Sequence, residues 1–506
     1  MHLTQGLHRS VQQKPNEVAV IDGDREISYA DLLSRVARLG AVMRGAGVES
    51  GDRIGILATN SAMYLECVLA CAWIGAVLSP INNRWSPDEM AFQVDDAGIS
   101  MLIADPAHRE TVTMLAQRDS VLKAVVTDDY DERIESAEPI DDVYADPDAL
   151  AVLMYTGGTT GRSKGVMLSA RQILTSGYGT FVSAGLPNYD ERVLHVSPLF
   201  HLAAFGGMMQ HVILGSTHVF MGDFAVDKLV DTIAEKQITI VTLVPTMVQR
   251  MLDHADSTGV NLSSLRSVGY GSAPMPQPVV ARLAELLPDV TLRQAYGMTE
   301  LGPVATVLRD EDHRNPEHPE RRGSVGKAAM HAEVRVVDSD DVEVPRGDVG
   351  EIVCRGENMM MGYWRRPEET AAALRGGWMH TGDLGYMDAH GYVYLVDRLK
   401  DMIVSGGENV YSAEVEKVLI HHPAVASCAV IGVPDRDWGE RVHAVIVSEP
   451  GVTVTAAEIR DYVGARIARY KAPRTVDFVE QMPLSPVGKI LKRVLRDQYS
   501  GPRVNR

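Results

Sequence analysis

Cysteine is scarce in this sequence, which has four such residues, Cys67, Cys71, Cys354 and Cys428, among 506. Cys67 and Cys71 are four positions apart, which is the wrong spacing for a redox or zinc CxxC motif. We therefore expect buried thiols and neither a disulfide framework nor a zinc site. This cysteine usage fits a reducing cytoplasm.

Long hydrophobic runs are also missing. The most apolar stretch, Val68 to Leu78, is too short to cross a bilayer and predicts a core helix. The N-terminal residues MHLTQGLHRSVQQKPNE lack the apolar segment of a secretory signal peptide. Both absences predict a cytoplasmic protein without a membrane segment.

Positive charge is in deficit, since 49 Lys and Arg residues face 67 Asp and Glu residues and the formal net charge is -18. A surface with this much negative charge repels phosphate backbones and anionic lipids. We therefore expect neither a nucleic-acid partner nor integral membrane association. An anionic small molecule would need a site that is locally positive or rich in backbone N–H groups. Composition leaves the oligomeric state open, a homodimer included.

The remaining composition is that of an ordinary globular protein, long enough for a large domain and a smaller one. Amphipathic helical segments alternate with continuous apolar runs, and one such helix is expected to open at Ser28. Runs of this kind suit strands covered on both faces, so the pattern predicts an α/β fold of helix-flanked sheets. The clearest strand-like runs are residues 54–58, 101–104, 150–155 and 238–244.

The second half of the chain changes character. Short alternating strands separated by glycines predict a β-rich subdomain at about residues 325–398. A compact helix and strand pattern follows Lys400, so we place a domain boundary near residue 399, with an N-terminal domain 1–398 and a C-terminal α+β domain 399–506. The stretch 311–322, ahead of the β-rich subdomain, is a polar loop, and we expect its histidines, His313 among them, to be solvated.

The strongest local motif is TGGTTGRSKG, which directly follows the strand-like LAVLMY. Its glycines expose backbone N–H groups, its threonines add hydroxyls and its lysine adds charge, which together suit a polyphosphate. The motif is not a Walker A sequence, because the glycine spacing differs and Gly165 follows Lys164. The residues that we single out are Thr156, Gly157, Gly158, Thr159, Thr160, Gly161 and Lys164.

Other motifs are modest when taken one at a time. QAYGMTE (294–300) follows a strand, and its Glu300 could hold Mg²⁺, which takes one or two carboxylates besides phosphate oxygens. GYGSAPMP (269–276) is an elbow of small residues against which a flat ring could lie. HTGDLGYMD (380–388) places Asp383 on a glycine turn, and LSPVGKILK (484–492) places Lys489 near the C-terminus.

The order and spacing of these motifs resemble those of the adenylate-forming superfamily over essentially the whole chain, and most of all its acyl- and aryl-CoA ligases. The resemblance implies that ATP and Mg²⁺ activate a carboxylic acid as an acyl-adenylate, which coenzyme A then converts to an acyl-CoA. Pyrophosphate and AMP are released. It also implies that the C-terminal domain moves about a hinge at Lys400. Many members carry serine where this chain has Gly157.

The resemblance assigns residues to the nucleotide and to catalysis. The 156–164 motif would hold the β- and γ-phosphates, Glu300 would carry Mg²⁺, and Lys489 would bridge the acyl carboxylate and the α-phosphate. Asp383 would bind the ribose with help from Arg398. The remaining nucleotide contacts implied are Ser272, Ala273, Pro274, Tyr296, Gly297 and Thr299.

The resemblance also assigns residues to the acid and to coenzyme A. His201, in SPLFHLAAFGG, would lie near the acyl carboxylate, and small residues around it leave room for an aromatic ring or a medium chain. The other acyl-pocket residues implied are Phe205, Gly206, Gly207, Gly271 and Met298. Those implied for coenzyme A are Gly406, Gly407, Trp438 and Arg84, with a packed core aromatic as the alternative role of Trp438.

Three other functions remain in view. An amino-acid adenylation unit would carry an aspartate in the acyl pocket, and residues 198–204 contain no acid. An acyl-AMP ligase that loads a carrier protein would have an extra segment near the hinge, where Lys400 leads directly into the 406–407 turn. A non-catalytic nucleotide-binding protein would not need Lys489, Asp383 and Glu300 together.

Overall fold

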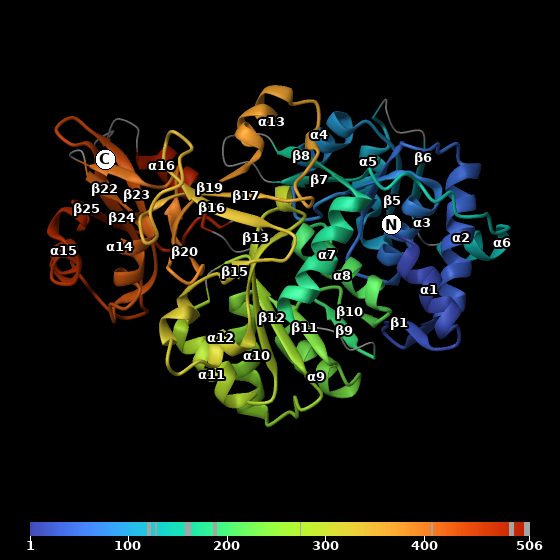
Figure 1. Cartoon of the computed structure of the whole chain (residues 1–506), viewed down its shortest axis with the longest axis horizontal. Coiled ribbons are helices and arrows are strands. Elements are labelled where there is room, and N and C mark those ends of the chain that lie inside the picture. The colour runs from blue at the N-terminus through green and yellow to red at the C-terminus, as the bar shows by residue number, and fades with distance from the viewer. Residues whose placement is uncertain are drawn as a thin grey trace. The chain divides into compact units, whose positions relative to one another are not determined.

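The computed structural model describes residues 1–118, 123–126, 129–156, 163–185, 190–273, 275–405, 408–484 and 490–499, with the backbone alone for 123–126. The chain divides into two compact units (Figure 1). The first comprises Met1–Val334, Val353–His380 and His390–Val393, and the second comprises Arg335–Ile352, Thr381–Ala389 and Tyr394–Arg506. The domain boundary predicted near residue 399, which separates the C-terminal domain expected to move, stays a prediction.

A large sheet of the first unit has the strand order β15-β14-β13-β12-β11-β9-β10-β1-β2. Its strands from β13 through β1 pair in parallel, and antiparallel β14, β15 and β2 lie toward its edges. The bounds are β1 (Val18–Asp22), β2 (Arg25–Ser28), β9 (Arg192–His195), β10 (Thr217–Phe220), β11 (Ile240–Leu243), β12 (Ser267–Gly271), β13 (Thr291–Gly297), β14 (Val304–Leu308) and β15 (Lys327–Ala328).

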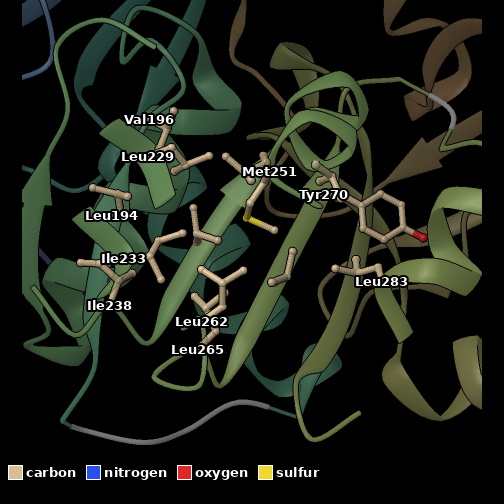
Figure 2. Close-up of a cluster of buried hydrophobic side chains, with 14 of the residues drawn as sticks. Leu194, Val196, Leu229, Ile233, Ile238, Met251, Leu262, Leu265, Tyr270 and Leu283 are labelled. Carbon is tan, nitrogen blue, oxygen red and sulfur yellow. The ribbon is translucent and has the colours of Figure 1, made fainter. Parts of the chain in front are cut away.

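Helices cover this sheet because their apolar faces pack on its buried strands. Side chains of α9, α10 and α11 form one core with those of β9, β11, β12 and β13, and Figure 2 shows members of that core such as Leu229, Met251 and Leu283. The helices associated with this sheet are α1 (Gln5–Gln13), α7 (Ala170–Ala184), α8 (Leu202–Leu214), α9 (Val226–Glu235), α10 (Pro245–Thr258), α11 (Gln277–Leu286) and α12 (Asp310–Arg314).

A second sheet of the first unit has the order β18-β8-β7-β4-β3-β5-β6, with β8 antiparallel to both of its neighbours. Its strands are β3 (Arg53–Leu57), β4 (Val77–Pro80), β5 (Ile99–Ala104), β6 (Lys123–Val126), β7 (Leu150–Thr156), β8 (Lys164–Ser169) and β18 (Gly362–Tyr363). Its helices are α3 (Ala62–Ile74), α4 (Pro87–Ala97), α5 (Arg109–Leu115) and α13 (Pro367–Ala373). Helix α2 (Tyr29–Gly45) packs on α3 and on β1 and β2 of the large sheet, and α6 (Tyr130–Ser136) packs on α2. The hydroxyl of Ser28 caps α2, as predicted, by accepting the Asp31 N–H at 3.1 Å.

Two smaller sheets follow in the sequence. The predicted β-rich region forms a sheet in the order β16-β17-β19-β20, with β16 (Glu333–Val337), β17 (Gly350–Arg355), β19 (Met379–Met387) and β20 (Val393–Arg398). The C-terminal sheet consists of β21 (Ile403–Ser405), β22 (Glu408–Val410), β23 (Val425–Asp435), β24 (Gly439–Ser448) and β25 (Thr475–Phe478). Helices α14 (Ser412–Leu419), α15 (Ala456–Gly464) and α16 (Lys492–Tyr499) pack on it. The α/β fold class is thus confirmed.

Two local predictions were wrong. The apolar run from Val68 to Leu78 is not one helix, because Gly75 adopts φ 71° and ends α3, after which Val77 begins β4. His313 is buried rather than solvated, with 1% of its surface exposed. Its ring contacts the Tyr270 hydroxyl at 2.7 Å and the Arg309 carbonyl at 2.6 Å, so α12 carries it into the protein interior.

The burial of the cysteines agrees with the expectation drawn from the sequence. All four cysteines lie in the described part of the chain, where they are buried and form no disulfide. Burial raises the pKa of the Cys71 and Cys428 thiols to about 12. No helix within the described ranges combines the length and apolar composition that a bilayer crossing requires.

Candidate active site

The carboxyl ends of parallel strands β9, β11, β12 and β13 lie along one edge of the large sheet (Figure 1). Three predicted segments follow these strands directly: Ser272 and Ala273 after β12, Met298 to Glu300 after β13, and the residues leading to His201 after β9. Open α/β sheets bind ligands at this edge. Parallel pairing therefore explains how motifs that are far apart in the sequence come together.

The turn after β12 has little room and a strained backbone. A Cβ added at Gly271 would lie 2.7 Å from the Ala295 carbonyl oxygen, so only glycine allows β12 and β13 to approach so closely. Ser272 has φ 66°, a left-handed conformation that costs a non-glycine residue energy. Ser272 and Ala273 are exposed, and Tyr296 is partly buried on the neighbouring strand. The turn thus presents polar atoms and backbone beside an aromatic ring.

Glu300 has a buried carboxylate that is held by a tyrosine. It lies in the short 3₁₀ turn Thr299–Leu301 with 7% of its surface exposed, and the Tyr363 hydroxyl donates to its Oε1 at 2.8 Å. Burial and the negative charge of Glu300 raise the pKa of Tyr363, so the hydroxyl remains a donor. Gly297 precedes this turn where a Cβ would lie 2.0 Å from the Pro303 carbonyl oxygen, which requires glycine.

The glycine-rich hairpin is closed by its two ends. Thr156, the last residue of β7, pairs with Lys164, the first residue of β8. The Lys164 ammonium forms an ion pair with Glu369 and lies 5.0 Å from the centre of the Tyr363 ring. Because Tyr363 also contacts Glu300, the lysine end of the hairpin and the buried carboxylate belong to one site.

His201 lies at the start of the helix that carries most of the predicted acyl-pocket residues. It is the N-cap of α8, partly buried, with its ring 4.6 Å from that of Phe200. Phe205 is fully buried, and a Cβ at Gly206 would lie 2.9 Å from Pro303 Cδ. A Cβ at Gly207 would meet no heavy atom within 4 Å. The two neighbouring glycines therefore differ, one being required by packing and the other bordering open space.

In the second unit, the two residues predicted to hold the ribose contact each other. Arg398 Nε lies 3.2 Å from Asp383 Oδ1, and Arg398 is exposed. Gly382 and Asp383 lie within strand β19 rather than on the predicted glycine turn. Gly382 has φ 69°, and its N–H donates to Glu351 Oε1 at 3.0 Å. The pair of Asp383 and Arg398 is a partly buried carboxylate beside an exposed guanidinium.

The remaining described predictions lie on exposed surfaces. Lys400 follows β20 and is exposed, and Arg84 is exposed just ahead of α4. Trp438 is 41% exposed, with the Arg474 guanidinium 3.6 Å above its ring, so it is not a packed core aromatic. The predictions that lie outside the described residues are Gly157, Gly158, Thr159, Thr160, Gly161, Pro274, Gly406, Gly407 and Lys489.

Reasoning from sequence missed the segment that joins these motifs. Residues Asn358 to Trp364 contact both the Glu300 turn and the hairpin strand β8. No motif marks Tyr363, because its partner Glu300 is remote in sequence and their contact depends on the pairing of β18 with β8. The aromatic pair Tyr363 and Trp364 ahead of α13 was the one local signal available.

The chain matches two family descriptions and is similar to full-length proteins of known activity. Residues 7–364 match the AMP-binding enzyme family and residues 414–489 match the AMP-binding enzyme C-terminal domain. A feruloyl-CoA synthase of an Amycolatopsis species is 40% identical over 492 residues, covering 97% of this chain and 98% of that protein. A fatty acid–[acyl-carrier-protein] ligase of Streptomyces coeruleorubidus is 34% identical, covering 97% and 95%.

A solved structure extends the likeness to three dimensions. The o-succinylbenzoate CoA synthetase of Bacillus subtilis, solved with its acyl-adenylate intermediate, superposes with a TM-score of 0.87 at 32% identity and covers 98% of both chains. The AMP-binding description spans most of the chain, and identities of this size over full length reflect common descent. The chain belongs to the AMP-binding enzyme family, within its adenylate-forming acyl-CoA synthetase branch.

Proposed function

We propose that this synthetase joins an aromatic carboxylic acid to coenzyme A, consuming ATP and releasing AMP and diphosphate through an acyl-adenylate. The observation that carries the proposal is the 40% identity to a feruloyl-CoA synthase over 97% of the chain. The o-succinylbenzoate synthetase is also named for an acid with an aromatic ring. Both acids contain a flat aromatic ring, so a pocket for them must be wide enough for the ring. Neither acid has an amino group, so the pocket needs no acidic residue to pair with one.

The pocket residues support a flat apolar substrate. Ala203, Ala204 and Gly207 carry little or no side chain at the start of α8, and Gly207 borders open space. His201 stands at the N-terminus of that helix, where a partial positive charge favours a carboxylate. We assign His201 and Gly207 to the acid on this basis. The resemblance implies Phe205, Gly206, Gly271 and Met298 for the same pocket, where Gly206 and Gly271 also pack closely against Pro303 and Ala295.

Adenylation must bring two anions together. At a separation of about 4 Å and an effective dielectric constant of about 20, the acid carboxylate and one phosphate charge repel each other by about 4 kcal/mol. Lys164 and the backbone of the hairpin hold the phosphates, and Lys489 bridges the carboxylate and the α-phosphate. Asp383 and Arg398 bind the ribose, while Ser272, Ala273, Pro274, Tyr296 and Gly297 line the base.

Mg²⁺ fits the residues present, because Glu300 supplies one buried carboxylate that Tyr363 links to the lysine end of the hairpin proposed to hold phosphate. Mg²⁺ commonly uses one or two protein carboxylates and takes its other ligands from phosphate and water. When bound, it would neutralise phosphate charge during transfer. Thr299, beside Glu300, would contact the α-phosphate.

Thioester formation uses a second set of residues. In this proposal the C-terminal domain turns about Lys400, withdraws Lys489 and presents the 406–407 turn to the pantetheine arm. Trp438 and Arg84 are the contacts for coenzyme A, and the exposure of both side chains is compatible with that role. A cytoplasmic location and any homodimer remain expectations.

Loading of a carrier protein is the second candidate. The similar Streptomyces coeruleorubidus protein is named for an acyl-carrier-protein acceptor, and its identity to this chain is 34%. The two functions share the first half-reaction and differ in the thiol that accepts the acyl group.

A panel of carboxylic acids tests the proposal. The purified protein with ATP, Mg²⁺ and coenzyme A should release AMP with ferulate, coumarate or benzoate derivatives at rates at least about ten times those with fatty acids, a difference of about 1.4 kcal/mol in activation free energy. Replacing coenzyme A by a carrier protein identifies the acceptor. Preference for fatty acids would contradict the aromatic assignment, and AMP release with the carrier alone would favour the second candidate.

A further inference from the structure

The segment from Asn358 to Trp364 forms hydrogen bonds with the turn that contains Glu300. Asn358 is fully buried, and its side-chain N–H groups donate to the carbonyls of Leu301 at 2.5 Å and Val304 at 3.1 Å. The Met360 N–H donates to the Glu300 carbonyl at 2.8 Å. Both the backbone of Glu300 and the residues after it are therefore fixed by this one segment.

The same segment also forms hydrogen bonds with the hairpin strand. Strand β18 pairs antiparallel with β8, with Tyr363 opposite Val166. The Met361 N–H donates to the Met167 carbonyl at 3.0 Å, and the Trp364 N–H donates to the Gly165 carbonyl at 2.8 Å. Gly165 directly follows Lys164, so the segment holds the lysine end of the hairpin and the Glu300 turn in one frame.

Tyr363 is the side chain that connects these two ends. It is 8% exposed, its hydroxyl donates to Glu300 Oε1 at 2.8 Å, and the Lys164 ammonium lies over its ring. Hydrogen bonds to an ionised carboxylate are shorter and about twice as strong as those between neutral groups. A bond of this kind restrains the rotation of the carboxylate about its last side-chain torsion.

We propose that Tyr363 is a positioning residue which holds the Glu300 carboxylate in one orientation beside the lysine end of the hairpin, where it can receive a divalent cation together with nucleotide phosphates. The proposal rests on the proposed function for the nucleotide and the cation. It adds a residue outside the motifs and gives the 358–364 segment a role in metal and phosphate binding. Partners of metal ligands that act in this way typically contribute about 10- to 100-fold in metal affinity.

The test measures metal binding rather than turnover. Mn²⁺ affinity is measured by electron paramagnetic resonance for the protein with α,β-methylene-ATP, which cannot be cleaved between the α- and β-phosphates. Tyr363→Phe should weaken Mn²⁺ binding by about 10-fold or more. Affinity for the analogue without divalent cation should stay within about two-fold, because Tyr363 acts through the carboxylate and not on the nucleotide.

Tyr130→Phe is the matched control. Tyr130 is 7% exposed, and its hydroxyl donates to Glu66 Oε2 at 2.7 Å, so it is an equally buried tyrosine–glutamate pair at another place in the first unit. This control should leave Mn²⁺ affinity unchanged. Equal Mn²⁺ affinity in wild type and Tyr363→Phe, or equal weakening in both tyrosine variants, would overturn the proposal.

A second pair of variants covers loss of folding, since Tyr363→Phe leaves a buried charge with one partner fewer. Glu300→Gln removes that charge and keeps an acceptor for the hydroxyl. If Tyr363 acts through the carboxylate, Glu300→Gln and the double variant Glu300→Gln/Tyr363→Phe should bind Mn²⁺ equally within about two-fold. A further loss in the double variant would overturn the proposal. Wild-type protein that binds neither nucleotide nor Mn²⁺ would instead contradict the proposed function.

Discussion

Gly206 and Gly207, two adjacent residues of α8, have opposite surroundings. Packing against Pro303 requires glycine at position 206, whereas position 207 borders space in which a Cβ would meet no atom within 4 Å. A motif reading assigns both glycines to the same pocket because it sees only their small size. The structure separates a residue that maintains packing from one that can set the width of the pocket.

Gly207→Leu should therefore raise the KM for the acid by about ten-fold or more, because the leucine side chain would occupy space that the acid needs. The KM for ATP should change by less than about two-fold. Gly207→Ala is the control, and it should stabilise α8 by about 0.5–1 kcal/mol because alanine favours helix over glycine. Steady-state kinetics and thermal unfolding measure both effects. Unchanged acid kinetics in Gly207→Leu would place position 207 outside the pocket.

Strands of the two helix-flanked sheets could be predicted where their sequence is continuously apolar. The runs at 54–58, 101–104, 150–155 and 238–244 became β3, β5, β7 and β11 within a few residues at each end. The run from Val68 to Leu78 could not be divided, because apolar helix and apolar strand have the same composition and only the left-handed Gly75 separates α3 from β4.

The site was predictable in part for a related reason. The 294–300 motif was singled out because it follows a strand, and the carboxyl ends of parallel strands meet at one edge of a sheet. Tyr363 was not found, since its role depends on the register of β18 against β8, and register across remote strands leaves no local trace in the sequence. His313 was misread because polar neighbours do not reveal that a helix turns one side chain inward.

Strands β9 and β10 bury a histidine pair that should make this sheet sensitive to acid. His195 and His218 are 7% and 2% exposed, and their ring nitrogens lie 2.9 Å apart. Burial lowers the pKa of both, in the case of His218 to about 3, so both are neutral in the folded protein. In the unfolded chain both histidines have their ordinary pKa of about 6.5 and bind protons below that pH. Folding stability is therefore lost as the pH falls below about 6.5.

Each such histidine contributes about 1.4 kcal/mol of lost stability per pH unit between about 6.5 and its folded pKa. His218→Gln should lower the free energy of unfolding near pH 7. Between about pH 6.5 and about pH 5, the decline of that free energy should be shallower than in wild type by about 1.4 kcal/mol per pH unit. Urea denaturation followed by circular dichroism at several pH values gives the slopes. Parallel slopes in wild type and variant would show that His218 does not titrate with unfolding.

At the scale of the whole molecule, the proposed chemistry draws on residues from separate parts of the chain. The hairpin end at Lys164 and the carboxylate of Glu300 belong to the first compact unit, and Asp383 and Arg398 belong to the second. Lys489 lies outside the described residues, within the 414–489 match to the C-terminal domain of AMP-binding enzymes. Our account requires that Lys489 reach the nucleotide during the first half-reaction and leave it for the second.

Exchange of labelled pyrophosphate into ATP, driven by an aromatic acid, tests this claim most directly in wild type and Lys489→Ala. Wild type should catalyse exchange, and the variant should lose about 100-fold or more because one charge that stabilises the transition state is removed. Conversion of supplied acyl-adenylate to acyl-CoA should continue in the variant. Absence of exchange by wild type with any carboxylic acid, or equal loss of both half-reactions in Lys489→Ala, would contradict the account.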